Sequence, residues 1–373
     1  MPRRPARDAC SWRRTRRVQG NVALITAITL VMLCGFAAIA VDVGNMYRVR
    51  SQARAALDAA ALAGAGTLNG MTSGLALART RAIEQGRLHR VHQTNLELLP
   101  SQIELGNWTA ASGFQPAPSI DATNAVRIVH TTEPVTHLFG AVLGARSSTI
   151  GARAIAIGGG PMSTRCAFPL VVPDCAMNVA TQGNLCSYCM QMQDANSDTA
   201  GWTAFGDDPV SPPNIRRAVA AACSTISSDG RCGPDCTNPL SQNASINLGN
   251  GNMMNTGPNN FCPLIQDILQ RNGAPEPFRV TVPVIRTDPN ATGCNPSFSG
   301  TGQVAGFAEL TIFGASCGNN DTPVIAENPT PSLPCSPPSG NYLLATLQCG
   351  TRINAPAGDG AFWGVAGRPR LVE

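Results

Sequence analysis

The sequence predicts an α+β protein: a basic tail, an N-terminal transmembrane helix that continues into an alanine-rich helix, a small helix-plus-sheet module, and a disulfide-rich, loop-rich, mostly β domain. Three observations support this prediction. A long run near the N-terminus has no charged side chain, the apolar periodicity then changes from helical to strand-like, and 12 of the 14 cysteines lie beyond residue 160. The four parts are expected at residues 1–17, 18–41, 42–160 and 161–373.

The positive charge of the chain is concentrated in its N-terminal tail. Seven of the 27 basic residues lie in residues 1–17, and all 27 are arginine. The absence of lysine excludes Walker-A phosphate loops and pyridoxal Schiff bases, and the nearly neutral remainder argues against a nucleic-acid partner. Arginines directly before an uncharged run keep that end of a chain in the cytoplasm. The orienting residues are Arg13, Arg14, Arg16 and Arg17.

Residues 18–41 form the predicted membrane anchor. Their apolar part, Val22 to Val41, would rise about 30 Å as a helix, which is enough to cross the hydrocarbon core of a bilayer once. With the N-terminus in the cytoplasm, everything after Asp42 is expected outside it, in a single-pass topology. Cleavage after the small-x-small sequence Ala38-Ile39-Ala40 is one alternative to a retained anchor. A prepilin-type cut after Gly20 is a second, although Ile25 stands where pilins of that class carry glutamate, and the paired arginines would also fit twin-arginine export.

The helical period continues beyond the anchor in an alanine-rich stretch. Small side chains offer little apolar area but let another backbone approach closely, either within the same domain or from a partner helix. The residues expected on this packing face are Met46, Ala53, Leu57, Ala60 and Gly64.

The order of several short sequences in this region carries a family resemblance. They are Gly20-Asn21-Val22-Ala23, Ala40-Val41-Asp42-Val43-Gly44, Tyr47, Gln52 and Ala55 to Ala63. Residues 18–66 thereby resemble the N-terminal module of TadG-like proteins, in the TadE/TadG-like group of the tight-adherence (Flp) pilus machinery. The resemblance implies an inner-membrane component of pilus assembly or surface adhesion with an exported domain, and its motif brings no catalytic residue, cofactor or metal.

The rest of the chain divides at Gly158-Gly159-Gly160, which composition predicts to be a hinge. Before it we expect a helix over 72–98, strands over 102–108, 125–131 and 148–157, and a short helix over 135–143. After it we expect helices over 214–222 and 263–269 and strands over 278–286 and 304–313. Pro283 suits an edge strand better than a central one.

The cysteines carry the strongest chemical signal. Twelve of them lie in the exported part, and an even number in an oxidising compartment favours disulfides that compensate for a core with few aromatic residues. The candidates are Cys166, Cys175, Cys186, Cys189, Cys223, Cys232, Cys236, Cys262, Cys294, Cys317, Cys335 and Cys349. Their pairing cannot be read from the sequence, and Cys10 and Cys34 are expected to stay free. The CxxC of Cys186 and Cys189 lacks the second ligand pair that a zinc site needs.

Three further patterns resemble functional sites but lack residues or local structure that such sites need. Gly314 to Gly318 matches GxSxG after a strand, but turn residues follow it and no histidine lies downstream. His89 and His92 share a predicted helix without a third ligand. The calcium-like run Asp194 to Asp198 lacks the glycine and glutamate that such a loop requires.

These observations favour a non-enzymatic, membrane-anchored component of Flp pilus assembly whose exported domain, in the periplasm or at the cell surface, acts in scaffolding or adhesion. Its expected partners are the lipid bilayer and other Tad or Flp proteins, pilin included, with no cofactor, no nucleic acid and no small-molecule substrate. Two alternatives stay open at this point: an exported hydrolase that uses Ser316 of the GxSxG sequence, and a carbohydrate-binding or adhesive ectodomain unconnected with pili.

Overall fold

The computed structural model confirms an α+β chain with one long N-terminal helix and many strands in several sheets. It describes residues 19–70, 72–116, 123–181, 189–193, 200–206, 209–233, 239–249, 253–287, 298–318, 320–327, 337, 339–348, 351–358 and 362–372. The chain forms two compact units, Met1–Ala53 with Thr131–Ala152, and Arg54–His130 with Arg153–Glu373. The four-part division expected from the sequence stays a prediction.

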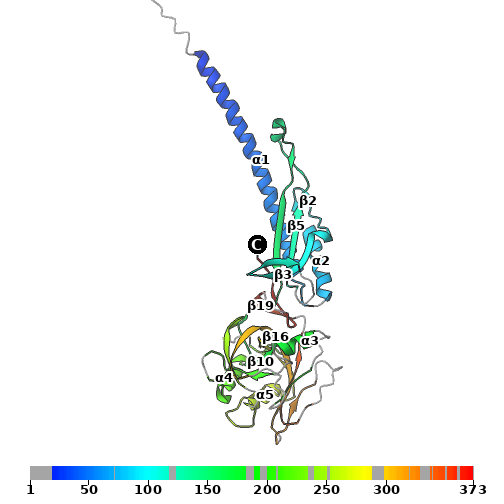
Figure 1. Ribbon diagram of the computed structural model, residues 1–373, viewed down its shortest axis with the longest axis vertical. Helices are drawn as coiled ribbons and strands as arrows, with labels where there is room; N and C mark the ends of the chain where they lie inside the picture. The colour runs from blue at the N-terminus through cyan, green and yellow to red at the C-terminus, as the bar shows by residue number, and fades with distance from the viewer. Residues whose placement is uncertain are drawn as a thin grey trace, which may run out of the picture. The chain divides into compact units, whose positions relative to one another are not determined.

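The first unit pairs the start of helix α1 (Gln19–Ala65) with a hairpin, as Figure 1 shows. The hairpin consists of β6 (Val135–Thr136), the 3-10 helix η2 (Gly140–Leu143) and β7 (Ser147–Ser148), with Val135 opposite Ser148. The expected helix over 135–143 was therefore wrong for most of its length. Two β-branched residues at its start pair with β7, and Gly144, at φ 91°, ends the single helical turn and reverses the chain.

The second unit begins with a five-stranded sheet in the order β21-β8-β5-β3-β4. Its strands are β3 (Ile103–Thr109), β4 (Gly113–Pro116), β5 (Ala125–Thr131), β8 (Gly151–Ile157) and β21 (Arg370–Leu371). Three of them confirm the strands expected before the glycine run. The pairing of β21 with β8 was not foreseen, and it returns the end of the chain to this sheet.

Helix α2 (Thr72–Arg87) is shorter than the helix expected over 72–98. It is followed by β1 (Arg90–Val91) and β2 (Thr94–Asn95), joined by a turn in which His92 and Gln93 have positive φ. His89 and His92 therefore do not share a helix. The 3-10 helix η1 (Pro100–Gln102) leads into β3.

The glycine run after β8 is buried and hydrogen-bonded, not a free hinge. The N–H of Gly158 donates to Asn124 O, Gly159 O accepts from Gly367 N, and Gly160 O accepts from Gly358 N. A Cβ on Gly158 would lie 1.9 Å from Ala65 O at the end of α1. Glycine is needed here because two backbones approach closely, which is a packing requirement that composition alone does not distinguish from flexibility.

The second sheet of this unit has eight strands. Six run in the order β11-β18-β16-β15-β10-β12, and β14 and β17 also pair with β16. Their bounds are β10 (Leu170–Pro173), β11 (Cys189–Gln193), β12 (Gly201–Trp202), β14 (Ser245–Leu248), β15 (Phe278–Ile285), β16 (Gly300–Cys317), β17 (Val324–Ile325) and β18 (Asn341–Leu347). Short pairs join β9 (Ser163–Thr164) to β13 (Leu240–Ser241) and β19 (Thr351–Pro356) to β20 (Val365–Arg368).

Helices α3 (Asp174–Thr181), α4 (Pro212–Ala222) and α5 (Cys262–Leu269) accompany the eight-stranded sheet, and α4 and α5 match the two helices expected there. Alternate residues of β15 and β16, such as Val280 and Leu310, enter its main core. Pro283 did not mark an edge strand, since β15 lies between β16 and β10. Pro283 lies between two contacts of β15 with the segment that forms β10: Thr281 O accepts from Phe168 N, just before β10, and the ladder with β10 begins at Val284.

Candidate functional site

The first half of α1 exposes large apolar side chains. Val31 and Phe36 are each 71% exposed, and the segment Asn21–Ala65 is the one helix among the described residues that is long and apolar enough to cross a membrane. Large apolar side chains exposed on all sides of a helical segment indicate that its surroundings are not water. Arg13, Arg14, Arg16 and Arg17 lie outside the described residues, so the orientation of the helix stays a prediction.

Asp42, the first charged residue after the apolar run, binds the hairpin of the same unit. Its Oδ1 accepts from the backbone N–H of Leu138 at 2.8 Å, and its Oδ2 accepts from Phe139 at 3.0 Å and Gly140 at 2.6 Å. We call this arrangement the tip clasp. In the sequence, Asp42 stands out only as part of the family resemblance, because the three donors that it binds lie almost a hundred residues further along the chain.

The tip clasp also changes the pKa of the Asp42 carboxyl group. Asp42 is buried, with 7% of its surface exposed. Burial raises the pKa of Asp42, but the three backbone N–H groups, together with His137, outweigh that effect and hold the pKa below its usual value of 3.8. A carboxylate that accepts several backbone hydrogen bonds is stabilised in its ionised form. Asp42 is therefore a charged structural acceptor at neutral pH.

The expected packing face lies on the second half of α1. Ala53, Leu57, Ala60 and Gly64 are buried, and Met46 is half-buried. An added Cβ on Gly64 would lie 3.0 Å from Ala78 O and 3.3 Å from Ala82 Cβ of α2, so these two helices approach closely within the second unit. Whether part of the face also meets a partner helix stays a prediction.

Two disulfides lie in the described part of the chain, Cys223–Cys232 and Cys262–Cys317. Cys166 and Cys175 are also disulfide-bonded, and Cys189 begins β11. Five candidates lie outside the described residues: Cys186, Cys236, Cys294, Cys335 and Cys349. Cys34 of α1 is free and exposed, as expected, whereas Cys10 lies outside the described residues.

The Cys223–Cys232 loop brings Arg231 to a buried carboxylate of the eight-stranded sheet. The loop runs beside β15, where Cys232 N donates to Arg279 O and Arg279 N donates to Gly230 O. Arg231 Nη2 lies 2.8 Å from Oε1 of Glu309, which is fully buried. The contact is an ion pair without a well-directed hydrogen bond, since neither oxygen of Glu309 has a hydrogen-bond donor in the structure.

The GxSxG sequence does not form the strand-turn-helix elbow of a hydrolase. Gly314 to Cys317 are extended within β16, Ser316 is 2% exposed and lies opposite Tyr342 of β18, and Cys317 is bonded to Cys262. A buried hydroxyl on an extended strand cannot reach a substrate as an elbow serine does. Among the described residues, no group of three or more His, Cys, Asp or Glu side chains could hold a metal, and the run at Asp194 lies outside them.

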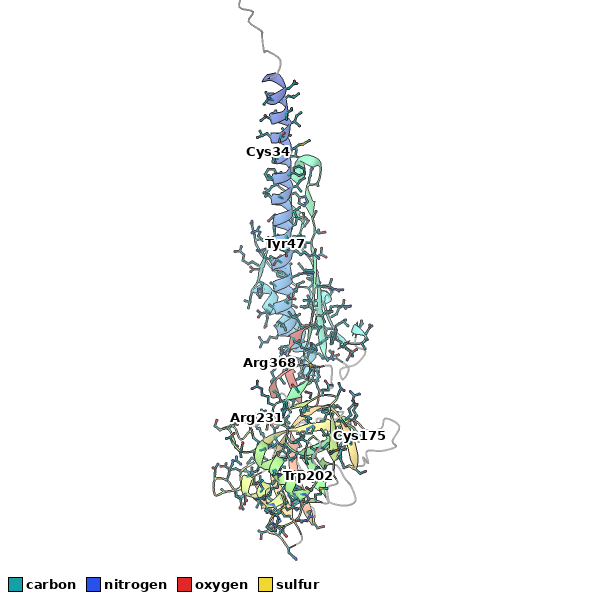
Figure 2. The ribbon with its side chains drawn as sticks, turned by 90° about the vertical axis from the view of Figure 1, so that its left-hand side faces the viewer. Cys34, Tyr47, Cys175, Trp202, Arg231 and Arg368 are labelled. Carbon is teal, nitrogen blue, oxygen red and sulfur yellow. A yellow bond between two sulfur atoms is a disulfide. The ribbon has the colours of Figure 1, made fainter. Side chains whose placement is uncertain are left out.

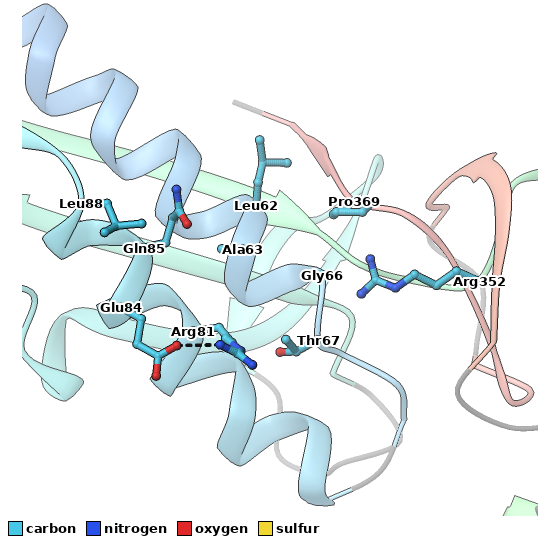
Figure 3. Close-up of a pocket in the computed structure, with 10 residues that line it drawn as sticks. All are labelled: Leu62, Ala63, Gly66, Thr67, Arg81, Glu84, Gln85, Leu88, Arg352 and Pro369. Carbon is cyan, nitrogen blue, oxygen red and sulfur yellow. Dashed lines mark hydrogen bonds and ion pairs between the residues drawn. The ribbon is translucent and has the colours of Figure 1, made fainter.

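A surface pocket of about 440 Å³ lies in the second unit at the end of α1, beside α2 (Figure 3). The ion pair of Arg81 and Glu84 lies at its wall, and Arg352 enters from β19. Its one hydroxyl group, of Thr67, donates to Gly64 O. The lining contains no nucleophile beside a base, so the pocket offers no catalytic constellation.

Comparison with known protein families gives a match in the N-terminal part of the chain. Residues 20–67 match the Tad family, described as Flp pilus-assembly TadE/G-like, over nearly the range that the sequence resemblance covers. No curated protein and no solved structure matches the chain. The matched range contains the exposed apolar half of α1, Asp42 and the buried alanine-rich face. Residues 20–67 of this chain are therefore similar to the TadE/G-like segment of the Flp pilus-assembly family.

Proposed function

We propose that the chain is a non-enzymatic component of Flp pilus assembly, anchored in the bacterial inner membrane by α1, with its N-terminus in the cytoplasm. The observation that carries this proposal is the coincidence of the TadE/G-like match with the only described helix that could span a bilayer. The domain beyond the anchor would lie in the periplasm or at the cell surface. There it would serve as a scaffold or adhesive surface for pilin or other Tad proteins.

The disulfides support the exported location of that domain. Structural disulfides persist in oxidising compartments and are rare in the cytosol. The described part of the eight-stranded sheet is cross-linked between α5 and β16 and within the loop that carries Arg231. Such cross-links suit a surface that must keep its shape under mechanical load, since they limit the unfolded conformations of the chain.

The proposal is tested by deleting the gene in its own host and counting surface pili by electron microscopy. Deletion should remove or strongly reduce Flp pili and attachment, and the wild-type chain should restore both. The matched variant Val31→Arg/Phe36→Arg, which places charges in the exposed apolar half of α1, should fail to restore them. Unchanged pilus number and unchanged attachment in the deletion strain would contradict the proposed role.

The orientation needs its own measurement. Alkaline phosphatase fused to the C-terminus is active only outside the cytoplasm, and green fluorescent protein fused there fluoresces only inside it. The proposal expects active phosphatase and no fluorescence. The opposite pair of results would place the disulfide-bonded domain in the cytoplasm and overturn the exported location.

A further inference from the structure

We propose that the tip of the β6–η2–β7 hairpin enters the surface of the same bilayer that α1 crosses, so that the chain contacts lipid at two points. The tip segment is residues 137–146. The inference rests on α1 being the membrane anchor, and it adds a second lipid-binding element that the family match, at residues 20–67, does not include.

The tip is apolar and exposed. Val142, in η2, is 85% exposed, and Leu138 and Phe139, which directly precede η2, are 68% and 46% exposed. No acidic residue occurs between Pro134 and Pro173, whereas Arg146 is exposed at the end of the tip. An apolar tip that ends in an exposed arginine matches a bilayer surface, where apolar side chains enter the acyl boundary and a cation meets anionic headgroups.

The tip clasp fixes the level of this tip along α1. Asp42 is the first charge after the apolar run, and it holds Leu138, Phe139 and Gly140 by their backbone N–H groups. Figure 2 shows the hairpin tip beside α1, between the labelled Cys34 and Tyr47. The exposed tip therefore lies at the end of the segment that is apolar enough to be inside the bilayer.

Exposed apolar surface continues from α1 onto the tip. Just before Asp42, the helix exposes Ile39 and Val41 to about the same degree, 51% and 50%. A partner protein that covered only the tip would leave this neighbouring helix surface unexplained, whereas lipid covers both. The continuity favours lipid as the occupant over a second copy of the chain or another protein.

The test is photo-crosslinking in the full chain, reconstituted in vesicles of phosphatidylethanolamine and phosphatidylglycerol that contain an alkyne-tagged phospholipid. The photoreactive amino acid p-benzoylphenylalanine replaces Val31, Val142 or Leu88, one at a time. Val31 reports the anchor, Val142 reports the tip, and Leu88, which is 76% exposed in the second unit, is a matched exposed apolar control. Val31 and Val142 should both form lipid adducts, several-fold more than Leu88.

The tip clasp is tested in the same vesicles. Asp42→Ala should lower lipid labelling from Val142 several-fold and leave labelling from Val31 unchanged, whereas Asp42→Asn, which keeps one acceptor oxygen, should be intermediate. Labelling from Val142 no stronger than from Leu88, or adducts of Val142 with protein in place of lipid, would overturn the proposal while labelling from Val31 still supports the anchor. Failure of labelling at Val31 as well would overturn both the anchor and the tip contact.

Discussion

The two large sheets of the second unit reach stability by different means. Apart from β21, the strands of the five-stranded sheet lie in residues 42–160, as do helix α2 and the second half of α1, and this part of the sequence contains no cysteine. There α1 and α2 meet through glycine and alanine. The eight-stranded sheet is accompanied by helices of only 8 to 11 residues, and it carries disulfides and a buried ion pair. Longer helices provide continuous contacts, whereas short elements joined by loops need cross-links.

The largest difference between the two regions should appear when an ion pair is broken. Arg231→Ala leaves the buried Glu309 without its counter-charge and should lower the free energy of unfolding by about 3–5 kcal/mol. The matched control is Arg81→Ala, whose partner Glu84 is solvent-exposed, with an expected cost of about 0–1 kcal/mol. Denaturant titration measures both, and equal effects would show that Glu309 does not depend on Arg231.

The two disulfides should differ from each other because they close loops of different length. In the chain-entropy account, Cys262→Ala/Cys317→Ala, with a separation of 55 residues, should cost about 4 kcal/mol. Cys223→Ala/Cys232→Ala, with a separation of 9, should cost about 2.5 kcal/mol. Thermal unfolding with and without a reductant checks this order. If a reductant lowered the melting temperature of the five-stranded sheet as much as that of the eight-stranded sheet, the two sheets would not differ in their dependence on disulfides.

The contacts of small residues are tested at two glycines of α1. Gly64→Leu must displace α2, because the first added atom already lies 3.0 Å from Ala78 O, and overpacking of this kind costs about 1–3 kcal/mol. Gly44→Leu meets nothing within 4 Å and should leave the unfolding free energy nearly unchanged. Equal melting temperatures for the two variants would mean that α2 can move aside without loss.

Local sequence patterns predicted the elements whose apolar residues recur with one regular spacing. They failed where a contact with residues far away in the sequence determines the structure. The uncharged run predicted α1, and the alternation from Phe278 predicted β15. The hairpin tip was expected to be a helix, because Pro134 and an apolar run are a local helix signal, while the acceptor for its N–H groups, Asp42, lies 96 residues away from the first of them. The two-residue strand β21 and the ion pair of Arg231 with Glu309 were not predicted for the same reason, since neither has a recognisable pattern within its own segment.

The smallest expected effect is a pH dependence of the tip clasp. Because the pKa of Asp42 is lower in the folded chain than its ordinary value of 3.8, the released hairpin binds more protons than the clasped one, and stabilisation increases with pH. The clasp should therefore be fully formed above about pH 5 and should weaken only as the pH falls below 3.8 toward the folded pKa. Amide hydrogen exchange at Leu138, Phe139 and Gly140, corrected for intrinsic rates, should show protection lost in that acidic window. In Asp42→Asn, protection should be weaker and should not change between pH 3 and pH 6. A wild-type chain that behaved like this variant would show that the charge on Asp42 contributes nothing to holding the hairpin.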